Sequence, residues 1–266
     1  ERSVGLPVPM EEAEENGQRF LEFLGVSGLE EARKLDAFFI RDRYAEYAKE
    51  HPRMFVAQDG IFCVGDPLAL LAKGKHVDVP MMAGNTADEF LNSICAGSQK
   101  ERRRKAEEIF GEEAERFLQF AEIAGAPMDG SVGTVSGIEC TVKSLFLQKK
   151  KAGSKQDAYY YRFDADIPGF DAPGTFHSVD LWFFFETLAK CWRPFVGRHY
   201  DLARQMCNYW ANFIKTGDPN GKDADGSEMP KWLPYTEGTP CEMVFTGQGA
   251  RPCCKGESEW KRFLMD

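Results

Sequence analysis

The 266-residue sequence lacks the Gly-x-Ser-x-Gly pentapeptide that presents a nucleophilic serine on a sharp turn between a strand and a helix. Gly25–Gly28 and Asp129–Gly133 match it only in part. Gly25–Gly28 brings its second glycine one residue too early, and Asp129–Gly133 has Asp in place of the first glycine with no apolar strand before it. No cysteine stands in a comparable setting. The chain therefore carries no recognisable nucleophile elbow of its own.

Positive charge and long apolar runs are also scarce. The net charge of −9 argues against a nucleic-acid partner, because phosphate binding needs clustered cations. The basic run Arg102–Lys105 is followed closely by Glu107 and Glu108, so we expect a solvated helix with ion pairs one turn apart. The longest apolar run lies around Leu181–Phe185, far short of the roughly 18 residues of a membrane span. We therefore expect neither nucleic-acid binding nor a membrane-spanning segment.

Cysteine and histidine are too sparse to suggest a metal centre. The sequence has eight cysteines, of which Cys63, Cys140, Cys191 and Cys207 lie in apolar stretches, so we expect buried, reduced thiols rather than a disulfide framework. The adjacent pair Cys253–Cys254 fits no Cys-x-x-Cys spacing. The four histidines are widely separated. We predict no metal site and no cofactor.

Apolar periodicity and terminal signals predict a chain rich in helices. A capping box at Ser27–Glu30 is expected to begin a helix that runs towards residue 48, with a break near Asp36. The other helices are predicted over residues 11–24, 99–123, 135–151, 180–188, 198–216 and 257–264.

Fewer strands than helices are evident. Met54–Val64 is typical of a short hairpin around Gly60, and the main strands are predicted at Val77–Gly84 and Asp157–Phe163. Pro80 lacks a backbone donor, which favours an edge position or the start of a strand. Two strands joined through helices make a poor sheet by themselves, so we expect further strands upstream.

Each main strand is followed by a residue suited to catalysis. Glu89 comes shortly after the first, and His177 lies in the loop Gly174–Asp180 beyond the second. Ester hydrolysis by a serine needs a base and a carboxylate that orients it, and the order acid then histidine is that of an α/β-hydrolase triad. The two residues are 177 − 89 = 88 positions apart, so only a fold that joins two strand ends can bring them together. Taken singly, each also fits an ordinary surface or structural role.

Four segments resemble the C-terminal half of the type B carboxylesterases, the family that includes para-nitrobenzyl esterases and cholinesterases. Gly84–Glu89 matches the acid motif of that family. Gly174–Leu181 matches its Gly-x-x-His-x-x-Asp-Leu motif, with Phe185 at the aromatic position downstream. Trp210–Gly221 and Pro230–Tyr235 match the signature near the family's C-terminus.

The resemblance implies an α/β fold in which residues 1–266 form the C-terminal part of a single α/β-hydrolase domain, with a mixed, mostly parallel sheet covered by helices and the N-terminal half absent. It implies a Ser-His-Glu triad that hydrolyses a small-molecule carboxylic ester, with Glu89 as the acid and His177 as the base. The serine and the oxyanion hole would come from a separate N-terminal chain, and this chain alone would be inactive. The alternative is a non-catalytic, cholinesterase-like interaction domain, and the presence of both Glu89 and His177 favours the enzyme.

Several residues near these motifs allow two interpretations. Phe90 stands where the family usually has Gly, and it either narrows the acyl pocket or packs in the core, the core being favoured. Asp180 either fixes the histidine loop or caps the following helix. In Trp182–Phe185, one face is expected to pack and another to line the acyl or alcohol pocket. Trp210, Phe213 and Ile214 are expected in the core at helical spacing.

Overall fold

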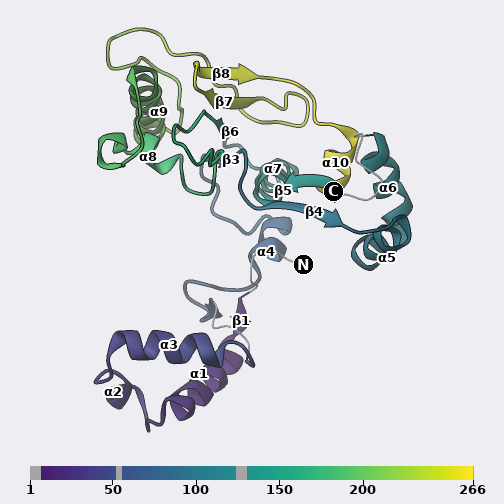
Figure 1. Cartoon of the computed structure of the whole chain (residues 1–266), viewed down its shortest axis with the longest axis vertical. Coiled ribbons are helices and arrows are strands. Elements are labelled where there is room, and N and C mark those ends of the chain that lie inside the picture. Colours follow the sequence, from purple (N-terminus) through teal and green to yellow (C-terminus); the bar gives the residue numbers. More distant parts are fainter. Residues whose placement is uncertain (1–6, 52–55, 124–130, 266) are drawn as a thin grey trace. The chain divides into compact units, whose positions relative to one another are not determined.

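The computed structural model describes residues 7–51, 56–123 and 131–265, which belong to two compact units, Glu1–His76 and Val77–Asp266 (Figure 1). The elements of the first unit are β1 (Val8–Pro9), α1 (Met10–Leu24), α2 (Leu29–Ala32), α3 (Ala37–Tyr47), β2 (Ala57–Gln58) and α4 (Pro67–Ala72).

Helices α1 and α3 of the first unit pack through aromatic side chains. Phe20 and Tyr47 are buried with their ring centroids 5.2 Å apart, and the Tyr47 hydroxyl donates to Asn16 Oδ1 at 2.6 Å. Gly25 ends α1 with a φ of 75°, and Asp36 caps α3 by accepting from two backbone N–H groups. The predicted end of the first helix and the break near Asp36 are thus confirmed.

Two predictions for the first unit are wrong. The capping box fails because Gly28 is the N-cap of α2, and the Ser27 N–H donates instead to Glu31 at 2.9 Å. The hairpin predicted over Met54–Val64, whose first two residues lie outside the described ones, is replaced by a parallel pairing of β2 with β1. The Asp59 carboxylate accepts from the N–H groups of residues 61 to 63, which folds that stretch into a turn.

The second unit contains the larger sheet and most of the helices. Its strands are β3 (Met81–Thr86), β4 (Leu91–Cys95), β5 (Ser131–Ser136), β6 (Ala158–Asp164), β7 (Glu242–Thr246) and β8 (Gly249–Cys253). Its helices are α5 (Gln99–Phe110), η1 (Gly111–Glu113), α6 (Ala114–Ile123), α7 (Gly137–Lys151), α8 (Leu181–Phe184), η2 (Leu188–Lys190), α9 (Gly197–Thr216) and α10 (Glu259–Met265). The predicted helices are confirmed in place, although those over 99–123 and 180–188 are interrupted.

Four strands of the second unit form one sheet in the order β3-β6-β7-β8. The first three are parallel and β8 is antiparallel to β7, which confirms the predicted mixed, mostly parallel sheet. β3 lies at an edge, as Pro80 indicated, but it begins at Met81 rather than Val77. β4 and β5, which the sequence reading missed, form a separate antiparallel pair.

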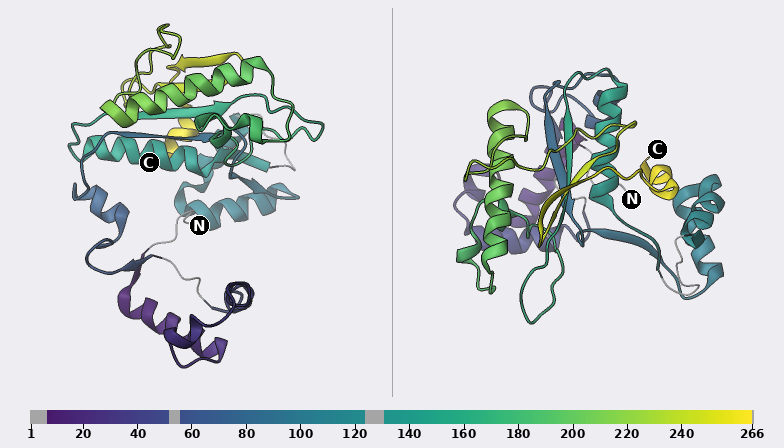
Figure 2. Two further views of the ribbon diagram at one scale, coloured as in Figure 1. Left: turned by 90° about the vertical axis from the view of Figure 1, so that its left-hand side faces the viewer. Right: turned by 90° about the horizontal axis from the view of Figure 1, so that it is seen from above.

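Helices cover both faces of the four-stranded sheet, α9 on one and α7 on the other (Figure 2). The side chains of β6 alternate between these faces, as the two-residue period of a strand requires. Tyr161 and Phe163 join the core cluster that includes residues of α9, whereas Tyr160 packs in a second cluster with Phe146 of α7. A sheet buried on both faces is the arrangement expected of an α/β fold.

The aromatic run before α9 divides between core and solvent. Phe183 and Phe184 are buried in the larger cluster, whereas Phe185 is 71% exposed. Trp210 and Phe213 of α9 pack against the same cluster, as predicted. The prediction is wrong for Ile214, which is 77% exposed because it lies about 100° around the helix from Phe213, beside the buried stripe.

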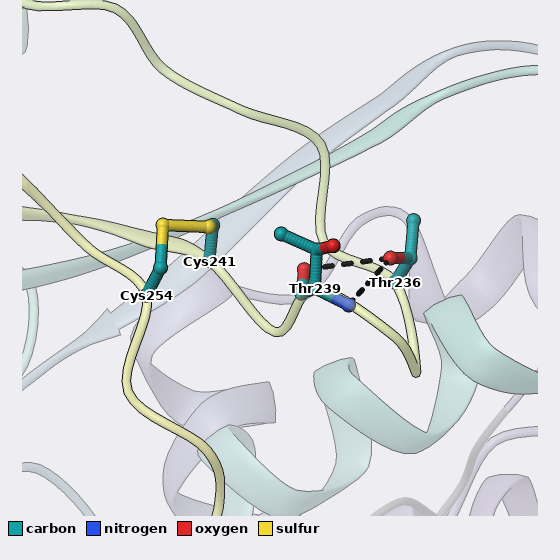
Figure 3. Close-up of a disulfide and its surroundings, with 4 residues drawn as sticks. All are labelled: Thr236, Thr239, Cys241 and Cys254. Atoms are coloured by element: carbon teal, nitrogen blue, oxygen red, sulfur yellow. Dashed lines mark hydrogen bonds between the residues drawn. A yellow bond between two sulfur atoms is a disulfide. The ribbon is translucent and has the colours of Figure 1, made fainter.

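A disulfide joins Cys241 and Cys254 at the base of the β7–β8 hairpin (Figure 3). The register pairs Glu242 with Cys253, so the residues just outside that pair lie opposite each other. The expectation of reduced thiols is therefore wrong for these two cysteines. Cys63, Cys140, Cys191 and Cys207 are free, as expected. Only Cys63 of these four is buried, so the expected burial is wrong for the other three, which are partly exposed.

Within the described ranges, no helix has both the length and the apolar character needed to cross a membrane.

Candidate active site

Glu89 sits in a tight turn directly after β3. It follows Thr86, the last residue of the strand, by three positions, and only 6% of it is exposed. The Thr86 N–H donates to Glu89 Oε1 at 2.8 Å, and the Glu89 N–H donates to the Thr86 carbonyl at 3.5 Å. The turn therefore folds the carboxylate back onto the end of the strand and holds it there.

His177 reaches this carboxylate from the loop between β6 and α8. Its Nδ1 lies 2.5 Å from Glu89 Oε2, and its side chain is 59% exposed. Because β3 and β6 are parallel neighbours, the segments that follow them emerge at the same edge of the sheet. The structure thus brings together the two residues that the sequence singled out, while their catalytic role stays a prediction.

The pairing suits general base catalysis. A carboxylate that accepts a hydrogen bond from Nδ1–H fixes the tautomer in which Nε2 is free to take a proton. The buried carboxylate also stabilises the imidazolium that forms when Nε2 is protonated. The arrangement can therefore activate a hydroxyl placed near Nε2.

Asp88 ties the histidine loop to the acid turn. Its Oδ2 accepts from the Thr175 N–H at 2.8 Å and from the Thr175 hydroxyl at 3.0 Å, and its own N–H donates to the Thr175 carbonyl at 3.3 Å. Gly174 has a φ of 63°, and a Cβ there would come within 2.6 Å of Asp88 Oδ2. The sequence reading gave Asp88 no role, and the only signal for one was its position beside Glu89.

Asp180 ties the same loop to the sheet. It is buried and accepts a hydrogen bond of 2.9 Å from the Tyr161 hydroxyl of β6. Although Asp180 is the N-cap residue of α8, its side chain makes no capping hydrogen bond. Of the two interpretations left open for Asp180, the contacts favour fixing of the loop.

Burial is the main cause of the shifted pKa values of Asp180 and Tyr161. It raises the pKa of Asp180, and the nearby charge of Glu89 acts in the same direction, while the Tyr161 hydrogen bond opposes both. Burial also raises the pKa of Tyr161 well above its usual range, with Asp180 adding to the effect. Tyr161 is therefore a hydrogen-bond donor at any physiological pH.

Phe90 does not pack in the core, so the favoured interpretation of this residue is wrong. It is 56% exposed, and its ring centroid lies 4.6 Å from that of the His177 imidazole, with the rings tilted by 57°. The backbone explains the difference, because a φ of 44° turns the residue away from the path of an ordinary strand.

Two of the remaining histidines have structural contacts elsewhere. His51 stacks on Tyr47 with ring centroids 4.1 Å apart. His199 is buried at the start of α9, where its Nδ1 accepts from the Val196 N–H at 3.0 Å. Among the residues whose placement is described, no three His, Cys, Asp or Glu side chains gather in a way that could hold a metal ion.

Comparisons with known proteins find similarity to carboxylesterases and cholinesterases. The carboxylesterase family model matches residues 128–252, a range that includes His177 but not Glu89. Acetylcholinesterase of Gallus gallus is 29% identical over 147 residues, covering 52% of this chain and 18% of that protein. Acetylcholinesterase 1 of Caenorhabditis elegans is 32% identical over 121 residues, covering 44% of this chain and 19% of that protein.

Solved structures of PNB esterases share the fold over almost the whole chain. A thermophilic PNB esterase superposes with a TM-score of 0.63 at 18% identity, covering 98% of this chain and 56% of that one. Another PNB esterase structure gives a TM-score of 0.66 at 18% identity, with 99% and 56% covered. This chain thus spans about half the length of these structures and about a fifth of the cholinesterases. Over residues 128–252 it resembles the carboxylesterase family, and its fold is that of the PNB esterase structures.

Proposed function

We propose that this chain supplies the acid and the base of a Ser-His-Glu triad that hydrolyses carboxylic esters of small molecules. The observation that carries the proposal is the 2.5 Å contact between the buried Glu89 carboxylate and Nδ1 of the exposed His177. The similarity to carboxylesterases and cholinesterases supports ester hydrolysis as the reaction class.

In the proposed reaction, His177 Nε2 takes the proton of a serine hydroxyl as the serine oxygen attacks the ester carbonyl. The imidazolium, stabilised by Glu89, then gives this proton to the leaving alcohol oxygen as the ester bond breaks. Water attacks the resulting acyl-serine with the same help from His177, which releases the acid and restores the serine.

The serine is proposed to come from a separate N-terminal chain. In the described residues β3 pairs only with β6, so its other side is open to a further strand. A parallel strand added there would end beside Glu89 and His177, and the turn after it would present a serine to Nε2. The lack of a Gly-x-Ser-x-Gly turn in the 266 residues supports this division of the triad.

The proposal is tested by assaying the chain with and without such a partner. We expect no hydrolysis of para-nitrophenyl acetate by the 266-residue chain alone, because it has neither nucleophile nor oxyanion donors. Adding the polypeptide that carries Gly-x-Ser-x-Gly should restore turnover, and a fluorophosphonate probe should label a serine on that polypeptide. Turnover by the chain alone, with the probe attached within residues 1–266, would contradict the split triad.

The same assay distinguishes the esterase from the alternative, a non-catalytic interaction domain. A partner whose elbow has Gly or Ala in place of serine, together with an absence of turnover, would favour the cholinesterase-like interaction domain. The His177→Ala variant of the complete preparation is the control, since it should lose turnover and fluorophosphonate labelling together, because the probe reacts with a serine that the histidine activates.

A further inference from the structure

Two residues with an unfavourable backbone conformation directly follow Glu89 and His177. Among the described residues, the non-glycine positions with positive φ are Phe90, Ala172, Ser178 and Glu186. Phe90, with a φ of 44°, directly follows Glu89, and Ser178, with a φ of 69°, directly follows His177. Side chains with a Cβ rarely adopt this conformation, and it persists where the surrounding structure requires it.

Phe90 is the least expected of these residues, because a bulky side chain at positive φ is a genuine outlier. Burial of its ring does not account for it, since 56% of the residue is exposed. What the ring does contact is the His177 imidazole, at 4.6 Å between centroids. The strain therefore coincides with a contact to the proposed base.

The backbone of Phe90 is firmly held. Its carbonyl accepts from the Gly137 N–H at the start of α7 at 3.3 Å. The next residue, Leu91, begins β4 and pairs with Ser136 of β5. Phe90 thus connects the acid turn to a paired strand, which gives its ring a fixed base from which to contact the imidazole.

His177 needs such a contact. Its side chain is 59% exposed, and its hydrogen bond to Glu89 is made through Nδ1. One hydrogen bond fixes the position of Nδ1, but it lets the imidazole plane turn about that contact. A ring packed on the imidazole limits this rotation.

We propose that Phe90 is a positioning residue for His177: its ring packs against the imidazole and keeps Nε2 directed at the nucleophile. The kinetic part of this inference rests on the proposed esterase function, whereas the contact itself does not. The two parts are therefore tested separately.

The contact is tested by NMR on the 266-residue chain. The ring protons of His177, assigned by their loss in His177→Asn, should show an upfield ring-current shift. That shift should be lost in Phe90→Leu and retained in Phe90→Tyr, because only the latter keeps an aromatic ring. Unchanged His177 signals in Phe90→Leu would overturn the inference, whether or not the protein hydrolyses esters.

The kinetic role is tested in the complete esterase with the matched pair Phe90→Ala and Phe90→Gly. Both remove the ring, so both should lower kcat roughly 10-fold with KM changed less than about 2-fold, because a misdirected base slows chemistry rather than binding. Phe90→Tyr should stay within about 2-fold of the unmodified enzyme in both constants.

Stability separates positioning from a merely structural role. Glycine adopts a φ of 44° without strain, so Phe90→Gly should melt roughly 2–4 °C above Phe90→Ala although both lose the same activity. Activity that follows melting temperature, or a raised KM with kcat retained, would overturn the positioning role, the latter in favour of a substrate-pocket wall. If even the unmodified preparation is inactive, the esterase proposal fails and the NMR result alone decides the role of Phe90.

Discussion

The acid turn and the histidine loop hold their catalytic candidates in different ways. Glu89 lies three residues beyond β3, buried, with its carboxylate bonded to the backbone of the strand end. His177 lies 177 − 164 = 13 residues beyond β6, exposed, in the irregular segment that leads to α8. The acid is fixed by its own turn, whereas the base depends on contacts that other residues make.

Those contacts are made by residues that lie before and after His177 in the sequence. Thr175, two residues before His177, is bonded to Asp88 of the acid turn. Asp180, three residues after it, is bonded to Tyr161 of β6. A long loop loses many conformations on folding. The hydrogen bonds of Thr175 and Asp180, on either side of His177, restrict the conformations open to the residues between them. The comparison predicts that damage decreases from the two proposed catalytic groups to these hydrogen-bonded anchors.

Removal of the base should have the largest effect. In the proposed two-chain esterase, His177→Ala is expected to lower kcat by roughly 10⁴ to 10⁶, because the proposed base is then missing. The measurement is steady-state hydrolysis of para-nitrophenyl acetate, with circular dichroism as the check on folding. A loss below about 100-fold would mean that His177 is not the base.

Neutralising the acid should cost less than removing the base. Glu89→Gln keeps the shape of the side chain but neither stabilises the imidazolium nor fixes its tautomer, so kcat should fall on the order of 10³ to 10⁴. Near-normal kcat in this variant would show that another carboxylate orients His177. The fold should persist, which thermal unfolding would verify.

Removing the hydrogen bond from Tyr161 of β6 to Asp180 should have a moderate effect on kcat. Tyr161→Phe removes the hydroxyl that donates to buried Asp180, which should lower the free energy of unfolding by about 1–3 kcal/mol and kcat by roughly 10-fold. Tyr209→Phe is the matched control. Tyr209 lies in the same core cluster as Tyr161, and its hydroxyl donates to a backbone carbonyl, that of Pro230. An equal loss of kcat in both variants would attribute the effect to general instability.

The buried carboxyl group of Asp180 should also make the stability of the protein depend on pH. Because the pKa of Asp180 is raised in the folded protein, the folded state binds its proton more tightly than the unfolded state. The stabilisation from Asp180 is therefore present at low pH and is lost as pH rises through the folded pKa. The free energy of unfolding, compared with that of Asp180→Asn, should fall as the pH rises above the ordinary aspartate pKa of about 3.9. A rise above that pH in urea titrations would mean that the carboxylate is stabilised in its charged form.

What could be predicted from the sequence depended on local signals. The helix end at Gly25 and the α7 and α9 helices follow from periodicity and terminal residues, and the Glu89–His177 pair follows from motifs placed after two strands. β7 was missed although Met243–Phe245 is buried, because a run of about five residues carries too little periodicity to separate it from a loop.

Other features depended on structure that no local pattern encodes. The Cys241–Cys254 bond follows from the register of a hairpin that was not predicted. The exposure of Phe90 follows from a positive φ, which a phenylalanine gives no reason to expect. Asp88 becomes recognisable as an anchor only when Thr175 is seen opposite it, whereas Asp180 was already a candidate from the sequence, and its contact with Tyr161 favours that role.

The anchor within the acid turn should give the smallest effect, and it distinguishes the two adjacent acids. Asp88→Asn keeps an oxygen that can accept from both Thr175 donors, so kcat should stay within about 2-fold. Asp88→Ala removes the acceptor and leaves the buried Thr175 N–H without it, so kcat should fall roughly 5-fold as the histidine loop loosens. If Asp88→Asn were as damaging as Glu89→Gln, the charge of Asp88 rather than its acceptor oxygen would be needed, and Glu89 would not be the acid of the triad.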